Sequence, residues 1–325
     1  MATITPAALY PVSGSYATTP SYSGTFIPSI WSAKLNAKFY ASTTFGDVSN
    51  TNWEGDISSM GDKVVINNIP TLTVNDYTVG TNLTYEVPTP NTIELTVDKG
   101  KYFAFQVNDV IDHQAKPNLM DTFSTDAGNQ LKIKVDTDCW LAVYNQSDSN
   151  NVGANAGAIT QGFNMGTDAA PVTLTSANIL SYITQMATIL DEQNIPESDR
   201  WLVITPFERQ LLMNSNMAQA QFMGDSTSIL RNGRIGQIDR FSVYLSNLLP
   251  RAAANFNYIG GADAGKVKRH TILAGHKSAL TFASQINKVE TIRNPNDFGD
   301  YVRGLMVYGR KCVLPTGLTC GIIAG

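Results

Sequence analysis

A long polar stretch in the first third of the chain most constrains how this protein can fold. Residues 67–91 read NNIPTLTVNDYTVGTNLTYEVPTPN, a threonine-rich run with too little apolar surface to build a core of its own. The flanking segments Lys63–Ile66 and Thr92–Val97, and Lys101–Val107 beyond them, are rich in β-branched and aromatic residues, which favours strands. The pattern predicts a long hairpin that projects from the body of the protein.

The beginning of the chain has the same property. Residues 1–26 consist mainly of Thr, Ser, Tyr, Ala, Gly and Pro, with no repeating apolar face, which predicts an extended arm. After Pro28, the spacing of Trp31, Leu35 and Phe39 predicts a short helix that Ser29 can cap. An arm and a hairpin that cannot bury surface alone indicate that neighbouring subunits complete one another.

Composition excludes several classes of function. Of 325 residues, 43% are hydrophobic and only 15% are charged, and the net charge is -4. There is no surplus of basic residues to drive strong binding of nucleic acid. No apolar run reaches the ~20 residues that cross a bilayer, and the first residues do not have the pattern of a secretory signal. We therefore expect synthesis in the cytoplasm and no membrane partner.

Cysteines and histidines are few and scattered. Cys139, Cys312 and Cys320 are an odd set, which favours free thiols in a reducing compartment over a Cys312–Cys320 bridge across a hairpin. The histidines, His113, His270 and His276, lack the spacing of metal ligands. We expect no metal site.

A long helix is predicted after the hairpin. Leu119, Phe123, Ala127, Leu131 and Val135 follow one another at steps of four residues, as far as Cys139. Pro117 is expected near the start of this helix. A straight row of this spacing winds around the helix, so its apolar stripe is expected to pack against several elements in turn.

The second half alternates helices and strands, after an Asn/Gly/Ala-rich boundary at residues 147–171. Ile179, Ile183, Met186 and Leu190 predict a helix that Thr175 or Ser176 caps. A helix is also expected from Pro206 and another over the sequence SALTFASQ, residues 278–285. The expected strands are Trp201–Thr205, Phe241–Leu245, His270–Ala274, Val289–Arg293, Val302–Val313 and Leu318–Ile323. This order indicates the α+β class.

No motif predicts catalysis. The stretch GGADAGKV, Gly260–Val267, has the G-x-x-x-x-G-K spacing of a phosphate-binding loop. However, Val267 replaces the Ser or Thr that holds magnesium, and a strand-like segment follows where a helix is needed. A nucleotide-hydrolysing site from Gly260 to Lys266 is therefore kept only as an alternative.

Other charged groups have ordinary interpretations. The pairs Asp136 with Asp138 and Asp297 with Asp300 are interpreted as solvated or capping residues, and Lys266, Lys268 and Arg269 as at most a weak phosphate contact. We predict no catalytic, cofactor-binding or metal-binding residue, no cofactor and no enzyme activity.

Several phrases, taken in order, resemble one family. They are FIPSIWSAKL, NWEGDISSMGDKVVI, FQVNDV, DRWLVITPFERQLL, RNGRIGQIDRFSVYLSNLLP and TFASQINKVETIRNPNDFGDYVRGLMVYGRKCVLP. Their order and spacing resemble the major capsid protein of tailed double-stranded DNA bacteriophages, which has the Hong Kong 97-type fold. The resemblance covers residues 26–323.

The resemblance implies a domain plan. Its parts are an N-terminal arm (1–27), an N-terminal helix region (28–49), an E-loop hairpin (50–100), a peripheral or P-domain with a long spine helix (101–150 and 288–325) and an axial or A-domain (151–287). The family also implies self-assembly into hexamers and pentamers that form an icosahedral head around packaged DNA, bound without sequence specificity. The location implied is the virion capsid, assembled in the bacterial host cytoplasm.

Further partners follow from the same resemblance. The helix of the arm begins by Ser29, so no cleaved scaffolding segment is expected, and a separate scaffolding protein is implied together with a portal protein. A decoration protein is left open. Lys63, Lys99 and Lys101 have no recognisable isopeptide partner, so we predict shells without covalent cross-links. The alternatives are an encapsulin-like cellular compartment of the same fold and a β-rich fibre or adhesin.

Overall fold

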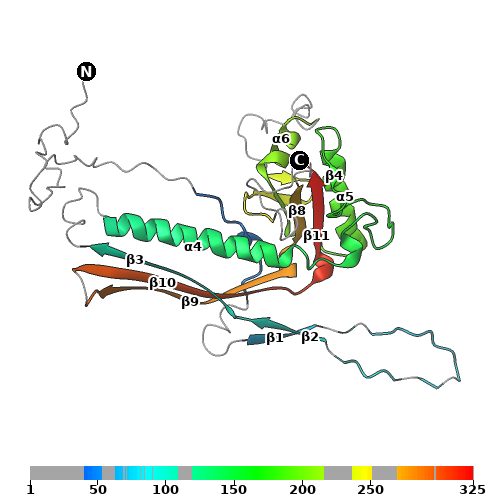
Figure 1. Ribbon diagram of the computed structural model, residues 1–325. Coiled ribbons are helices and arrows are strands. Elements are labelled where there is room, and N and C mark those ends of the chain that lie inside the picture. The colour runs from blue at the N-terminus through cyan, green and yellow to red at the C-terminus, as the bar shows by residue number, and fades with distance from the viewer. Residues whose placement is uncertain are drawn as a thin grey trace, which may run out of the picture.

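The computed structural model describes residues 40–52, 63–68, 70, 72–80, 82–83, 85–89, 91–108, 119–215, 236–250, 269–295 and 298–324. Within these residues the chain forms three sheets and a long helix (Figure 1). The expected arm, the helix expected from Trp31 to Phe39 and the loop Gly260–Val267 lie outside the described residues.

The predicted hairpin is confirmed. Strands β1 (Lys63–Asn68) and β2 (Asn91–Thr96) pair in antiparallel register. The described residues between them extend far from the body of the protein (Figure 1). At the base of the hairpin, Ile66 and Leu95 are buried in a small cluster with residues of the two long C-terminal strands. The hairpin is therefore anchored at its base and projects beyond it.

A long helix lies along a three-stranded antiparallel sheet (Figure 1). The sheet has the order β3 (Lys99–Asn108), β10 (Gly299–Cys312), β9 (Leu280–Arg293). Helix α4 (Leu119–Val143) contacts β3 and β10, and the ring of Phe123 meets that of Phe105 edge-on at 6.1 Å. The predicted long helix from Leu119 to Cys139 is confirmed, and Pro117 lies outside the described residues.

The apolar stripe of α4 is covered unevenly. Val135, Cys139, Trp140 and Val143, in the last part of the helix, are buried, whereas Phe123 is 46% exposed. The covered part packs against α1 (Phe45–Val48) and against the six-stranded sheet described below, which forms the second unit of the protein. The beginning of the helix therefore still has apolar surface to offer.

The second unit is built on a six-stranded sheet. The strand order is β4 (Val172–Thr173), β11 (Leu318–Ala324), β8 (Arg269–His276), β5 (Arg200–Ile204), β7 (Phe241–Leu245), β6 (Gln237–Ile238). Helices α5 (Ile179–Glu192) and α6 (Pro206–Met213) pack on one face. The other face packs against α1 and the end of α4. The two faces therefore bury two separate clusters.

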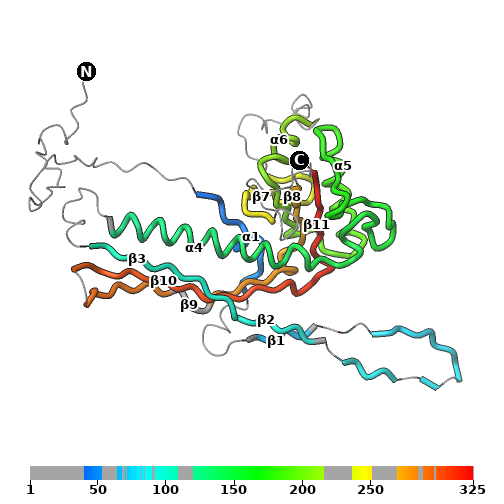
Figure 2. The backbone as a smooth tube through the Cα atoms, in the orientation of Figure 1, coloured from blue at the N-terminus to red at the C-terminus, as the bar shows by residue number. Residues whose placement is uncertain are grey.

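Short turns join the two units. Figure 2 shows the chain entering the second unit from α4 and passing twice more between the two sheets. The turns are η2 (Ser149–Asn151), η4 (Lys277–Ala279) between β8 and β9, and η5 (Pro315–Gly317) between β10 and β11. Because β11 pairs with β8, the end of the chain lies in the six-stranded sheet.

Two local predictions are wrong. Residues 278–285 were expected to be helical but belong mostly to β9, because they pair with β10 from Leu280 onward and this long-range pairing overrides the helix propensity of Ser, Ala and Leu. Neither Thr175 nor Ser176 caps α5, whose N-cap is Asn178. The Asn178 amide oxygen accepts a bond from the Thr175 N–H at 2.7 Å, which closes a turn before the helix.

The expected start of α6 is confirmed. Pro206 is its first residue and Thr205 its N-cap, where a proline costs no hydrogen bond. The buried Glu208 carboxylate reaches back and accepts a bond from the Thr205 N–H at 2.7 Å. Thr205, Pro206 and Glu208 therefore form a capping box with a proline at the first helical position, which is a typical sequence pattern for the start of a helix.

Candidate functional site

The two aspartates of the first expected pair are both held by structural partners. Asp136, on α4, is buried and accepts bonds from the backbone N–H groups of Phe45 at 2.8 Å and Thr44 at 3.2 Å. It thus caps α1 from another helix. Asp138 accepts a bond from the Tyr308 hydroxyl at 2.7 Å and pairs with Arg310 at 3.0 Å.

The two carboxylates therefore have different roles: Asp136 caps α1, and Asp138 binds side chains of β10. Burial raises the pKa of the Asp136 carboxyl to about 6, and burial together with the Asp138 hydrogen bond raises the pKa of Tyr308. Capping describes Asp136, whereas the solvated interpretation fits neither residue. Asp300 pairs with Arg293, and Asp297 lies outside the described residues.

Asp136→Asn is expected to remove a pH dependence of stability. A folded-state pKa of about 6, above the ordinary 3.8, gives stability that is present below pH 4 and lost as the pH rises through 6. Asparagine keeps the acceptor for Phe45 but cannot ionise. The free energy of unfolding of the wild type, relative to this variant, should fall by up to about 3 kcal/mol between pH 4 and 7. Urea denaturation of the unassembled subunit at several pH values measures it, and parallel curves would refute the assignment.

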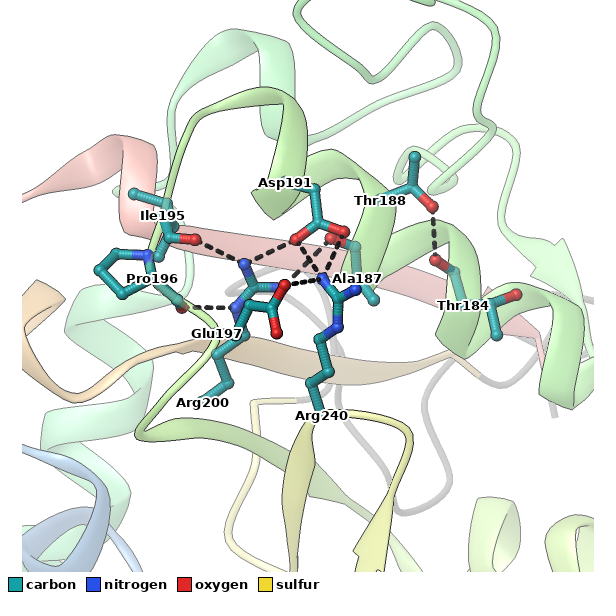
Figure 3. A network of polar contacts seen from close by, with 9 residues as sticks. All are labelled: Thr184, Ala187, Thr188, Asp191, Ile195, Pro196, Glu197, Arg200 and Arg240. Atoms are coloured by element: carbon teal, nitrogen blue, oxygen red, sulfur yellow. Dashed lines mark hydrogen bonds and ion pairs between the residues drawn. The ribbon is translucent and has the colours of Figure 1, made fainter.

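A second polar network fixes the second unit (Figure 3). Arg200, the first residue of β5, is buried and donates to the carbonyls of Ile195 at 2.6 Å and Pro196 at 2.8 Å and to the Asp191 carboxylate at 2.7 Å. Arg240, in the turn between β6 and β7, also pairs with Asp191, at 3.0 Å. The network ties α5 to two strands. No sequence motif indicated it.

A buried asparagine holds the junction between the two units. The Asn151 amide donates to the carbonyls of Thr316 at 2.7 Å and Leu318 at 3.0 Å and accepts a bond from Gln193 at 3.0 Å. Its backbone carbonyl accepts from the Thr319 hydroxyl at 2.7 Å. Sequence reasoning missed this residue, because an asparagine in an Asn/Gly-rich stretch resembles a solvated loop residue.

The cysteines are free and buried, so the predicted free thiols are confirmed. Burial raises the pKa of Cys312 and Cys320 to about 12, which leaves them without thiolate reactivity at neutral pH. His276 lies at the end of β8, where its Nδ1 accepts a bond from the Ser278 N–H, and His270 stacks on Phe207. His113, Lys266 and Lys268 lie outside the described residues, within which no group of side chains could hold a metal ion. Among the helices that the structure describes, none has the length and apolarity of a membrane span.

The projecting hairpin exposes a large apolar surface. Its described tip is linked across by a bond from the Thr73 N–H to the Glu86 carboxylate at 3.1 Å. Large apolar side chains along the tip are at least 60% exposed: Leu72, Val74, Tyr77, Val79, Leu83, Tyr85 and Val87. A concentrated apolar surface of this kind marks an interaction site. The arrangement fits contact with another macromolecule.

Comparisons with known proteins agree with this picture. A family model described as phage capsid protein matches residues 90–320. A comparison with curated protein sequences gives no match. A solved structure from Mycobacterium phage Che8 is 25% identical, with a TM-score of 0.72 over 91% of this chain and 97% of that one.

Two further solved structures share the fold at lower identity. The capsid of cyanophage P-SCSP1u is 18% identical, with a TM-score of 0.67 over 98% of each chain. The capsid of Myoviridae phage XM1 is 13% identical, with a TM-score of 0.58 over 91% of this chain and 96% of that one. These similarities confirm the α+β, Hong Kong 97-type fold that the sequence resemblance implied. Because the family match also spans more than half of the sequence, the chain belongs to the phage capsid protein family and is a structural protein of the virion shell.

Proposed function

We propose that this protein is the subunit that assembles into the hexamers and pentamers of an icosahedral phage head around packaged double-stranded DNA. The observation that carries the proposal is the hairpin, which is anchored at its base and exposes the apolar side chains of its described tip. Leaving so much apolar surface in water is unfavourable, and a neighbouring subunit can cover it. The half-covered stripe of α4 supports the same interpretation.

The domain plan implied by the family is part of the proposal. We propose residues 1–27 as the arm, 28–49 as the N-terminal helix region, 50–100 as the E-loop, 101–150 with the strands from residue 288 as the P-domain, α4 as its spine helix, and 151–287 as the A-domain. Because β11 pairs with β8, we assign Leu318–Ala324 to the A-domain sheet instead of the P-domain.

The same proposal names the partners. A separate scaffolding protein, a portal protein and packaged DNA follow from the role of a head subunit, and a decoration protein stays open. Assembly is proposed in the host cytoplasm, without covalent cross-links between subunits and without enzyme activity. The nucleotide-binding alternative at Gly260–Lys266 rests on sequence alone, because that loop lies outside the described residues.

Electron microscopy of the expressed protein, with and without a co-expressed scaffolding protein, tests the proposal. Closed shells of hexamers and pentamers are expected. A protein that stays monomeric under both conditions would refute it. Shells that enclose a protein cargo and no nucleic acid would favour the encapsulin-like alternative, and elongated trimers would favour a fibre.

A pair of hairpin variants tests the apolar tip. Val74→Asp with Val87→Asp should leave the free energy of unfolding within about 0.5 kcal/mol of the wild type, because both side chains are at least 85% exposed. The yield of shells should fall at least about tenfold, because two charges would be buried under a neighbour. Asn75→Asp with Thr89→Asp places the same charges at polar, exposed positions of the tip and is the control. Equal yields for the two pairs would show that the apolar tip is not buried on assembly.

A further inference from the structure

One short loop of the second unit makes several hydrogen bonds of its own. It joins η2 to β4 and folds back on itself, with Ala156 and Phe163 exchanging backbone bonds of 2.7 and 3.0 Å. Ala156 and Met165 are fully buried in the cluster under α5. The stem of the loop is thus part of the core.

One carboxylate, that of Glu192, accepts several hydrogen bonds from the tip of this loop. Glu192, the last residue of α5, accepts bonds from the N–H of Ile159 at 2.8 Å and of Thr160 at 3.2 Å, and from the Thr160 hydroxyl. Gly157 has φ 109°, and a Cβ there would lie 3.0 Å from the Glu192 oxygen. The bonds to Glu192 therefore hold the backbone of the tip in place.

What this fixed tip presents is a single large apolar side chain. Ile159 is 79% exposed although the loop around it is built into the core. Residues 153–166, GANAGAITQGFNMG, contain no charged residue. A rigid, uncharged loop with an aliphatic side chain at its tip loses little conformational entropy when another protein covers it.

The sheet order places a second surface at the opposite edge, where strand β7 lacks charged residues and Asp239 and Arg240 lie in the turn that precedes it. The loop leads directly into β4, at one edge of the six-stranded sheet, and the β6–β7 hairpin forms the other edge. Within the described residues, β6 pairs with β7 only. From Phe241 to Pro250 there is no charged residue, and Leu245 is 41% exposed.

The loop and the projecting hairpin lie on the same side of the protein, so that one neighbouring subunit could contact both. Figure 1 shows the loop between α4 and β4 on the side of the sheet toward which the projecting hairpin extends, and Figure 2 shows β7 on the other side. A neighbour on the loop side would therefore meet both the loop and the hairpin. Two different edges that meet give a head-to-tail contact, which forms a ring when the rotation between successive copies closes.

We propose that the Ile159 loop, residues 153–166, packs on the β6–β7 edge of the next copy of this chain within a ring-shaped capsomer, with Leu245 at the receiving surface. This inference rests on the proposed function, because it supplies one of the contacts that join subunits in a hexamer or pentamer. The partner is a second copy because the loop and the receiving strand, Phe241–Leu245, both lack charged residues and the chain belongs to a family of capsid proteins.

Substitution of the tip tests the contact. Ile159→Asp should reduce the yield of shells at least tenfold while the urea midpoint of the unassembled subunit stays at the wild-type value, and Ile159→Leu should assemble normally. Equal yields for Ile159→Asp and the wild type would overturn the inference. If the wild type itself forms no shells, the proposed function fails instead.

A cross-link tests the receiving surface. In Ile159→Cys with Leu245→Cys, mild oxidation of assembled particles should produce a ladder of covalent oligomers that ends at five or six subunits on a non-reducing gel. Each single variant is a control, since the three native cysteines are buried. Assembled shells of the double variant without any ladder would overturn the pairing of these two surfaces, and a ladder that stops at two subunits would replace the ring with a two-fold contact.

Discussion

Arg200→Ala is expected to lower the free energy of unfolding by about 2–4 kcal/mol, through the loss of several hydrogen bonds and of the packing of a buried side chain. The side chain is fully buried, and its guanidinium satisfies two carbonyls of the turn after α5, those of Ile195 and Pro196, as well as the Asp191 carboxylate. Alanine would leave the two carbonyls without this donor and would open a cavity where the buried side chain packs, while Asp191 would keep its pair with Arg240. Arg200→Lys should recover only part of the loss, because an ammonium group cannot reproduce the planar fork of donors.

Arg240→Ala is the matched control for this prediction. Arg240 pairs with the same carboxylate at 3.0 Å but is 39% exposed at its side chain, so its removal should cost less than about 1 kcal/mol. Urea denaturation of the unassembled subunit, followed by circular dichroism, measures both variants. If the two substitutions cost the same, the burial of Arg200 would not be the source of its contribution.

Trp140→Ala is expected to cost a similar amount, about 3–5 kcal/mol. The indole is fully buried where three elements meet. It lies edge-on to Phe45 of α1, with ring centres 5.0 Å apart, and to Trp201 of β5, at 5.8 Å. Alanine would open a cavity between the long helix, the six-stranded sheet and the segment that leads into the hairpin. We therefore expect a lower yield of shells as well as lower stability.

The next residue along α4 provides the control for Trp140. Leu141 is 55% exposed, and Leu141→Ala should change the free energy of unfolding by no more than about 0.5 kcal/mol. Trp140→Phe should fall between the two, because a smaller ring leaves a smaller cavity. Similar unfolding midpoints for all three variants would show that the junction tolerates loss of the indole.

Particular elements show why parts of this fold follow from the sequence. The runs of β-branched and aromatic residues in β3 and β5, the steps of four residues in α4 and the proline at the start of α6 each concern neighbours within a few residues. Backbone sterics and burial of one face determine the conformation of such segments locally. The same reasoning fails for residues 278–285, where the local preference for helix is reversed by pairing with β10.

The buried polar residues illustrate what local patterns cannot supply. The sequence identifies Asp136 as a carboxylate, but its partners Thr44 and Phe45 are 92 and 91 residues away. Asn151 is similar, because it binds backbone carbonyls near Leu318 that belong to the far end of the chain. The Ile159 loop was visible only as an Asn/Gly/Ala-rich boundary. The position of its exposed tip depends on Glu192, which lies 33 residues further along the chain.

The sequence by itself determined the α+β class, the projecting hairpin, the long helix and, through the order of several phrases, the capsid family. Only the tertiary structure decided that β11 returns to the six-stranded sheet, which carboxylates are buried and which loop presents an apolar tip. The physical reason is the separation along the sequence between the residues that interact. Periodicity and turn chemistry act between residues close in sequence, whereas strand pairing, burial and the partners of a polar group depend on segments that meet only after the chain has folded.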